Sequence, residues 1–182
     1  MTSKPWRFIA EQVFPLSPAQ VWELLSNTEH LNRTIGLPSV IYEEPVVTDG
    51  DFYRHASIKL LGLIAVRWKE YPFRWVRHER YSVLRVFEDG LLERVIGGIE
   101  LQESPAGTVV RIFTQITPRH ILGHLITPLV GRKAVRDVMR YCKTAVALSL
   151  SGSANSFYVA AVVKPLFPCF PSLASFLEEL CH

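Results

Sequence analysis

The stretch at residues 14–38 constrains the fold of this chain more than any other part of the sequence. Ser17 is a favourable helix N-cap, and Pro18 then occupies the first helical position, where its missing N–H has no cost. Gln20 follows Ser17 by three residues, which is the spacing of a capping box. A second helical turn is predicted over residues 29–33. The sequence therefore predicts two short helices immediately after the first strand.

Seven strands are predicted around these helices. Apolar and polar residues alternate in 6–14 and in 75–87, and turn signals separate most of the remaining strands. Asp89-Gly90 is the clearest hairpin turn between the later strands. No connection between those strands is long enough for a crossover helix, so we expect an antiparallel meander. Gly97 and Gly98, inside the sixth strand, predict either a β-bulge or the close approach of another backbone. The predicted strands are 6–14, 40–47, 52–61, 64–70, 75–87 (with a bend), 91–102 and 108–117.

A long helix is predicted over residues 120–150, and Pro128 is expected to kink or restart it. Apolar residues at helical spacing predict one buried stripe along it. A curved antiparallel sheet can wrap such a helix, burying the stripe and leaving a cavity between them, so the fold class is α+β. The stripe is formed by Leu122, Leu125, Ile126 and Leu129, and then by Val135, Val138, Met139, Cys142, Ala145 and Val146.

Composition argues against several functional classes. The formal net charge of +3 is small, and Arg and Lys are spread along the chain, which argues against nucleic-acid binding. Cys142, Cys169 and Cys181 have no metal-type spacing, which favours a reduced protein. The N-terminus lacks the apolar core of a signal peptide, so we expect a cytoplasmic location.

No catalytic motif is present in the sequence. It contains no nucleophile elbow, Walker loop or dinucleotide fingerprint, and nothing in it implies a cofactor. His120 and His124 have i,i+4 spacing, but no acidic residue lies near them in the sequence, so no metal site is predicted.

The order of these elements, together with particular residues, resembles the START-like superfamily, also called SRPBCC or helix-grip proteins. Residues 17–38, SPAQVWELLSNTEHLNRTIGLP, are similar to its opening signature. Over residues 6–150 the chain is most similar to the START-like domain found ahead of some bacterial class III adenylate/guanylate cyclases. Four pieces carry that similarity: Asn32 with Gly36-Leu37-Pro38, the stretch 68–75, the stretch 81–87 before Asp89-Gly90, and Pro118-Arg119.

The resemblance implies a hydrophobic or amphipathic ligand held between the sheet and the long helix. Superfamily members include lipid carriers, plant hormone receptors and polyketide cyclases, so the fold does not determine the function. This chain departs from the cyclase branch, because it contains no cyclase domain and no suitably placed pair of metal-binding aspartates.

Strand alternation selects candidate site residues. If Lys59 faces water, then Arg54 faces inward, and the same alternation on the next strand turns Trp68 and Glu70 inward. A buried charge needs a partner, and Arg54 and Glu70 can pair. The pair is either a polar anchor for a ligand head group or a structural ion pair at the sheet rim. If it is an anchor, Glu70→Gln is expected to weaken ligand retention with little loss of fold.

Aromatic residues on the strands either line a cavity or belong to the plain core. Arg119, beside the start of the long helix, either reaches the cavity mouth or lies on the surface. The candidate ligand-binding residues are Arg54, Trp68, Glu70, Trp75, Phe87, Phe113 and Arg119.

The chain is predicted to consist of a START-like ligand-binding domain at 1–150 and a linker with an apolar, proline-containing tail at 151–182. Lys164 and the prolines break up the apolar tail, which argues against a membrane span. The tail is either native or the start of a truncated second region.

Three functional hypotheses follow. The first is non-enzymatic binding of a hydrophobic small molecule, as a sensory module of a cyclase-type signalling protein. The second is an enzyme of the polyketide cyclase/dehydratase kind, which a cluster of inward polar residues would favour. The third is an interaction module whose apolar tail docks on a protein partner or on itself.

Overall fold

The computed structural model describes residues 4–36, 38–48, 50–60, 64–72 and 74–151. The predicted tail at 152–182 lies outside these residues. Among the described helices, none is long and apolar enough to cross a membrane. The elements are β1 (Trp6–Phe14), α1 (Pro18–Leu25), α2 (Thr28–Thr34), β2 (Ile41–Thr48), β3 (Asp51–Leu60), β4 (Ile64–Glu70), β5 (Arg74–Val76), β6 (Arg80–Phe87), β7 (Leu92–Ser104), β8 (Gly107–Pro118) and α3 (Ile121–Leu150).

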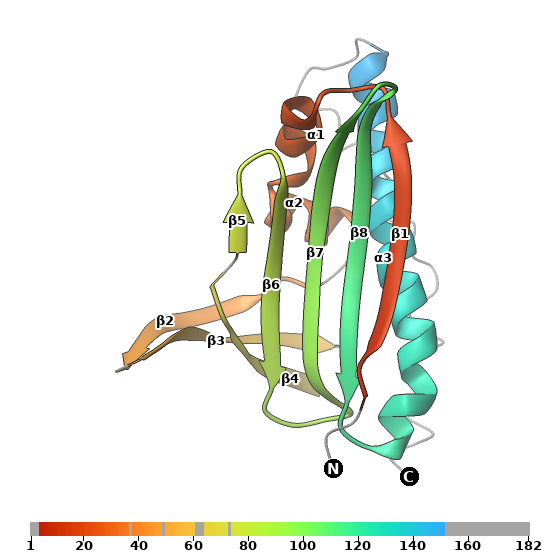
Figure 1. Ribbon diagram of the computed structural model, residues 1–182. Helices are drawn as coiled ribbons and strands as arrows, with labels where there is room; N and C mark the ends of the chain where they lie inside the picture. The colour runs from red at the N-terminus through yellow and green to blue at the C-terminus, as the bar shows by residue number, and fades with distance from the viewer. Residues whose placement is uncertain (1–3, 37, 49, 61–63, 73, 152–182) are drawn as a thin grey trace.

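The strands form one antiparallel sheet in the order β1-β8-β7-β6-β4-β3-β2, and β5 adds to β6 outside this path. The sheet is strongly curved: β6, β7, β8 and β1 stand side by side, whereas β2, β3 and β4 bend away from them (Figure 1). The long helix α3 lies against β8 and β1, and α1 and α2 lie near its C-terminal half. The predicted α+β helix-grip architecture is therefore confirmed.

The two short helices begin as the sequence predicts. Ser17 caps α1, and its side chain and that of Gln20 form the reciprocal capping box. The side chain of Asn27 caps α2 by accepting a hydrogen bond of 3.0 Å from the backbone N–H of His30. These caps satisfy backbone groups that a helix start otherwise leaves without partners.

The predicted fifth strand, 75–87, is wrong as a single bent strand. It is a hairpin in which β5 turns back on β6, with Trp75 opposite Tyr81. His78 makes the reversal with a φ of 64°, in the left-handed region that few residues other than glycine adopt. The turn residues Arg77-His78-Glu79 carry none of the usual Gly, Pro, Asn or Asp signals. The sequence pattern therefore runs from β5 into β6 without a turn signal, and it does not reveal the turn.

The close approach predicted at the paired glycines occurs at Gly98. A Cβ atom there would lie 2.5 Å from the carbonyl oxygen of Tyr81 and 2.7 Å from the ring of Phe113. The ladder is regular through Gly97 and Gly98, and the irregularity in β7 falls between Leu92 and Arg94 instead. No bulge forms at the two glycines.

The main core lies between α1, the C-terminal half of α3 and the strands β1, β8, β7 and β6. It contains the predicted helix residues Val135, Met139, Cys142, Ala145 and Val146, with Val138 packed against it. Burial raises the pKa of the Cys142 thiol to about 12, so this side chain behaves as a small apolar core group.

The first half of the predicted stripe on α3 is wrong. Leu125 and Leu129 are 69% and 65% exposed, whereas Gly123, Thr127 and Gly131 are buried. A Cβ atom on Gly131 would clash with the ring of Phe8, so the missing side chain lets α3 approach β1 closely. The helix also continues through Pro128 without restarting.

Candidate functional site

A row of charged and aromatic side chains crosses the sheet where β3, β4 and β6 pair. Arg54 on β3 is opposite Glu70 on β4, and Glu70 is opposite Arg85 on β6. Cross-strand partners point to the same face of a sheet, so these three side chains are neighbours. Arg85 follows Tyr81 and Val83 at two-residue spacing, and both are buried, so the row lies on the face that also holds the core.

Glu70 is the centre of this cluster and is only 2% exposed. Arg54 Nη2 donates to its Oε1 atom at 2.7 Å, and Arg85 Nε donates to its Oε2 atom at 3.0 Å. The indole Nε1 of Trp68 adds a longer hydrogen bond of 3.4 Å to Oε2. The pairing of Arg54 with Glu70 that alternation predicted is therefore confirmed.

The electrostatics keep Glu70 ionised. Burial alone would raise the pKa of this carboxyl, but the charge of Arg85 and the hydrogen bonds from both arginines outweigh it, and the pKa is lowered from its ordinary value. A carboxylate held in this way is a poor proton donor near neutral pH, and its low pKa also makes it a weak base.

Aromatic rings orient the two guanidinium groups. The Arg54 guanidinium carbon lies 3.6 Å from the ring centroid of Tyr42, and that of Arg85 lies 5.9 Å from the ring centroid of Trp68. Burial, followed by the nearby charge of Glu70, raises the pKa of Tyr42, so its hydroxyl stays protonated. Cation–π contacts of this kind hold an arginine in place without using its N–H donors.

An apolar row lies beside the charged one. Ala56 on β3 is opposite Trp68 on β4, which is opposite Phe87 on β6. The rings of Trp68 and Phe87 are 5.9 Å apart. The site therefore combines an ion cluster with an aromatic wall on one face of the sheet.

The start of α3 is fixed next to this wall. The Arg119 guanidinium donates hydrogen bonds to the backbone carbonyl oxygens of Phe87 and Glu88, the latter at 2.9 Å. Its backbone N–H donates to the carbonyl of Leu91. Arg119 thus braces the β6–β7 turn against the helix, and its assignment as a ligand-binding residue stays a prediction.

The structure brings together four of the seven sequence-predicted residues: Arg54, Trp68, Glu70 and Phe87. Trp75 lies elsewhere. It stacks on Tyr81 at 5.3 Å and meets Trp22 edge-on at 5.4 Å. Tyr81 is four residues along β6 from Arg85, about 13 Å for an extended strand. Trp75 therefore covers the core near α1 and does not join the ion cluster.

Phe113 is on the opposite face of the sheet. Its neighbours Ile112 and Thr114 are buried on the face covered by α3, and successive strand residues alternate between faces. Phe113 packs over Gly98 and pairs with Ile9. The prediction that it lines a cavity under α3 is wrong, because that prediction used its aromatic type and not its place in the alternation.

Two members of the cluster, Arg85 and Tyr42, were missed by sequence reasoning. Arg85 becomes a neighbour of Glu70 only because β4 pairs with β6 and not with the intervening β5. Its even spacing from Val83 and Tyr81, which puts all three on one side of the strand, was a usable signal for its direction. Tyr42 precedes an irregularity in the β2–β3 ladder, and strand patterns do not predict such shifts.

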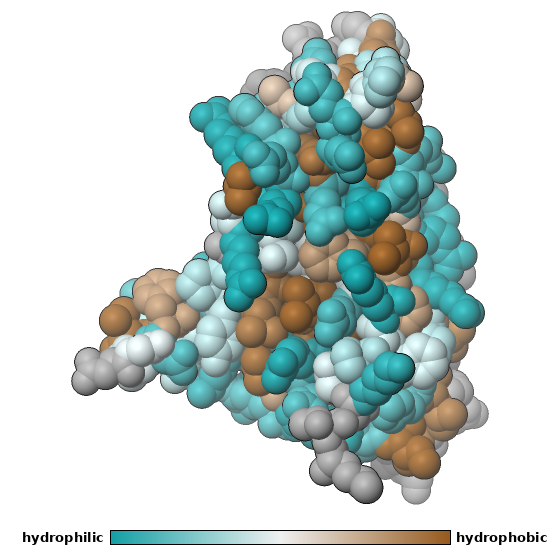
Figure 2. Space-filling model, in the orientation of Figure 1, coloured by the Kyte–Doolittle hydropathy of each residue, from teal (hydrophilic) through white to brown (hydrophobic). Residues whose placement is uncertain are grey.

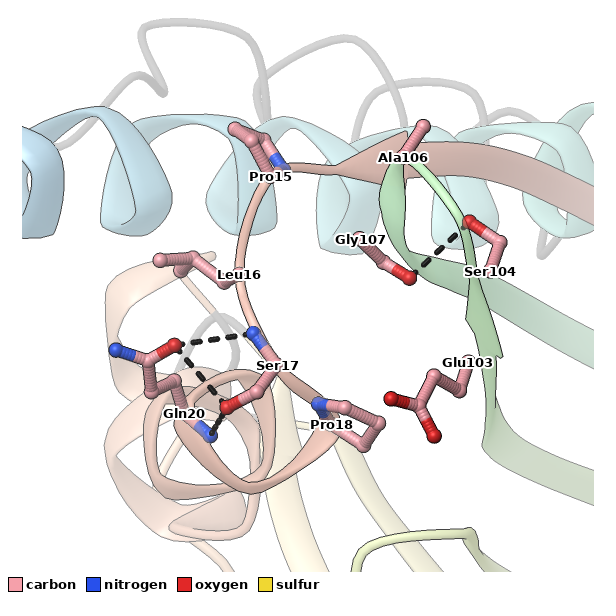
Figure 3. A pocket seen from close by; sticks show the side chains of 9 residues that line it. All are labelled: Pro15, Leu16, Ser17, Pro18, Gln20, Glu103, Ser104, Ala106 and Gly107. Carbon is pink, nitrogen blue, oxygen red and sulfur yellow. Dashed lines mark hydrogen bonds between the residues drawn. The ribbon is translucent and has the colours of Figure 1, made fainter.

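A separate groove of about 340 Å³, open to solvent, lies at the other end of the sheet (Figure 3). It separates the β1–α1 connection from the β7–β8 turn. Three of its polar side chains already serve the fold: Ser17 and Gln20 form the capping box, and Ser104 Oγ donates to the carbonyl of Gly107 at 3.1 Å. We assign no binding chemistry to it. Within the described ranges, no three His, Cys, Asp or Glu side chains come together as metal ligands.

Comparisons with known proteins agree with the fold. No family model matches the chain, and no curated protein matches it. Many solved structures do. The aromatase/cyclase ZhuI from Streptomyces sp. R1128 superposes with a TM-score of 0.59 at 11% identity, over 83% of this chain and 99% of that one. The di-domain aromatase/cyclase StfQ of the steffimycin biosynthetic pathway gives 0.59 at 9%, over 81% of this chain and 52% of that one.

A third match is the protein TTHA0849 from Thermus thermophilus, with a TM-score of 0.54 at 20% identity, over 79% of this chain and 99% of that one. Identities this low show a shared fold alone and do not bear on the activity. The chain has a START-like helix-grip fold, with a curved antiparallel sheet and a long C-terminal helix.

Proposed function

We propose that this protein binds an amphipathic small molecule without chemical turnover. The polar end of the ligand lies at the ion cluster of Arg54, Glu70 and Arg85, and its apolar body lies between the aromatic wall and the N-terminal half of α3. The observation that carries the proposal is a fully buried carboxylate whose two arginine partners stay partly open. The Arg54 and Arg85 side chains are 37% and 27% exposed, against 1% for Glu70.

This difference in exposure argues for an anchor over a purely structural pair. Burying ionised groups is costly, so a buried ion pair that serves only the fold is most stable where further hydrogen bonds within the protein satisfy its remaining donors. Here each guanidinium gives one hydrogen bond to Glu70, and the described residues provide no second hydrogen bond or carboxylate to either. Several N–H donors of each arginine are thus available to a ligand.

The helix supplies the second wall of the proposed site. Trp6 Nε1 donates to His124 Nδ1 at 3.3 Å, which fixes one flank of α3 beside the edge strand β1. At about 100° per residue, Leu122 and Leu129 lie on the opposite flank. Both are exposed leucines, and the helix start that carries them is braced to Phe87 by Arg119. Apolar groups are visible over this end of α3 at the lower right of Figure 2.

Enzymatic cyclase or dehydratase chemistry is the alternative. The ionised, doubly paired Glu70 is an unsuitable general acid, and this favours binding over catalysis. The aromatase/cyclase matches support the fold and a small-molecule site of this general kind. A sensory role ahead of a cyclase-type signalling protein, and a protein partner for the tail, rest on the sequence alone.

The test is titration of the full chain with N-phenyl-1-naphthylamine, a neutral apolar probe whose fluorescence rises when it leaves water. We expect saturable binding with one probe per chain. Leu122→Gln and Leu129→Gln should each weaken it about tenfold, because they place an amide in the apolar wall.

Ile9→Gln is the matched control, since Ile9 is a similarly exposed apolar residue that pairs with Phe113 on the outer face of the sheet. It should leave the affinity unchanged. Absence of saturable binding, or equal weakening by Ile9→Gln, would contradict the proposed function.

A further inference from the structure

The ion cluster carries an unbalanced charge. Two guanidinium groups face one carboxylate, and no other carboxylate among the described residues pairs with Arg54 or Arg85. The aromatic rings against the two guanidinium groups are those of Tyr42, whose raised pKa keeps it neutral, and Trp68, and the cross-strand neighbours Pro45 and Val95 carry no charge. One net positive charge therefore remains on the cluster of Arg54, Glu70 and Arg85.

The imbalance becomes costly when a ligand arrives. An apolar body over Trp68 and Phe87 would remove water from the two partly exposed guanidinium groups, and an unpaired charge in a dry site is strongly unfavourable. A cationic head group would add to the excess. A neutral head group would leave it uncompensated, whereas a single negative charge would cancel it.

The geometry suits a planar anion. Each arginine is held through one hydrogen bond to Glu70 and one aromatic ring, so the orientation of both guanidinium groups is set before binding. Guanidinium groups recognise carboxylates through paired N–H donors, and an orientation fixed in advance lowers the entropic cost of forming those bonds. A phosphate monoester would bring nearly two negative charges at neutral pH and would over-compensate the cluster.

We infer that the ligand is an apolar carboxylic acid whose ionised carboxylate binds Arg54 and Arg85 beside Glu70. The inference rests on the proposed function and specifies the chemical class of its ligand. Glu70 is then a positioning residue: it holds both arginines apart and reduces their combined charge to one.

The experiment is displacement of bound N-phenyl-1-naphthylamine from the full chain by palmitic acid, methyl palmitate and hexadecylamine. We expect the acid to displace the probe at a concentration at least tenfold lower than the ester, and the amine to be the weakest. Arg54→Gln and Arg85→Gln should each reduce the acid-to-ester preference to less than threefold while still binding the probe.

Arg67→Gln is the matched control. Arg67 immediately precedes Trp68 on β4, and successive strand residues alternate between faces, so its side chain points to the opposite face from Trp68. Arg67→Gln removes the same charge from the protein and should leave the acid-to-ester preference unchanged. Thermal unfolding of each variant identifies any that fails to fold, and either arginine variant suffices for the test.

Equal displacement by acid and ester, no displacement by either, or a preference that survives in the folded arginine variants would each overturn the inference. These results leave the proposed function standing so long as the probe binds. Failure of the wild-type chain to bind the probe overturns the proposed function itself, so the two failures are distinct.

Discussion

The two halves of the molecule bury their apolar residues to different extents. In the closed half, formed by α1, β1, β8 and the C-terminal half of α3, the inward apolar side chains meet in one buried core, and the exposed ones, such as Ile9 and Val13, lie on the outer face of β1. In the open half, formed by β2, β3, β4 and the N-terminal half of α3, large apolar side chains stay exposed, among them Ile41, Val47, Phe52, Leu125 and Leu129. Both halves are rich in apolar residues, so composition does not distinguish them.

Curvature and helix packing account for the difference. The helix approaches β1 and β8 closely because Gly123 and Gly131 have no side chain, and that approach turns its leucines away from these strands. The strands β2, β3 and β4 bend out of the plane of the others (Figure 1). The open half also holds the buried carboxylate of Glu70 and the side chain of Arg54, and Arg85 lies next to them on the neighbouring strand β6. An uncovered apolar surface beside a pre-oriented ion cluster is what an amphipathic ligand requires.

The largest expected difference between the two halves is in stability, when one leucine in each half is truncated to alanine. Leu25→Ala in the closed half removes a side chain that is 2% exposed, and we expect it to lower the free energy of unfolding by about 2–5 kcal/mol. Leu125→Ala in the open half removes a side chain that is 69% exposed and should change it by less than about 0.5 kcal/mol.

Urea unfolding of both variants at neutral pH measures the two values. A loss of more than about 2 kcal/mol for Leu125→Ala would mean that this leucine is covered in solution, contrary to the division into halves.

A smaller effect, confined to acid pH, is expected from Glu70. Its pKa is lowered in the folded protein, so its ionisation stabilises the fold above the ordinary glutamate pKa of about 4.3, and this contribution is lost as the pH falls through the lower folded value. Glu70→Gln lacks the titrating group. The stability advantage of the wild-type chain over this variant should therefore shrink as the pH falls below about 4.3.

Urea unfolding between neutral pH and the acid limit of folding measures the difference at each pH. Glu103→Gln, which removes an exposed carboxylate at the far end of the sheet, should follow the wild-type profile. If the Glu70→Gln and wild-type curves stay parallel through the acid range, Glu70 is not held as an anion by its arginines.

The sequence predicted the fold well because local signals agreed with the global arrangement. The capping box at Ser17, the alternation in β3 and β4 and the apolar spacing of residues 135–146 each correspond to an element or a buried face in the structure. The same alternation was enough to predict the ion pair of Arg54 with Glu70, because cross-strand neighbours follow once two adjacent strands are known.

What the sequence could not predict depended on packing between distant elements. Periodicity shows that Leu122, Leu125 and Leu129 share a side of α3, but it does not show that Gly123 and Gly131 let a different side of the helix approach Pro118 and Phe8 closely. Arg85 joined the site only through the pairing of β4 with β6 across an intervening hairpin. Phe113 was selected because it is aromatic, and the strand alternation that places its side chain on the outer face of the sheet was not considered.

The most direct test of the central claim is amide hydrogen exchange of the full chain with and without saturating N-phenyl-1-naphthylamine. We expect added protection in β3, β4, the end of β6 near Phe87 and the first turns of α3, with no change in α1 or the C-terminal half of α3. Protection confined to the closed half, or to the groove between the β1–α1 connection and the β7–β8 turn, would contradict the assignment of the open half as the binding site.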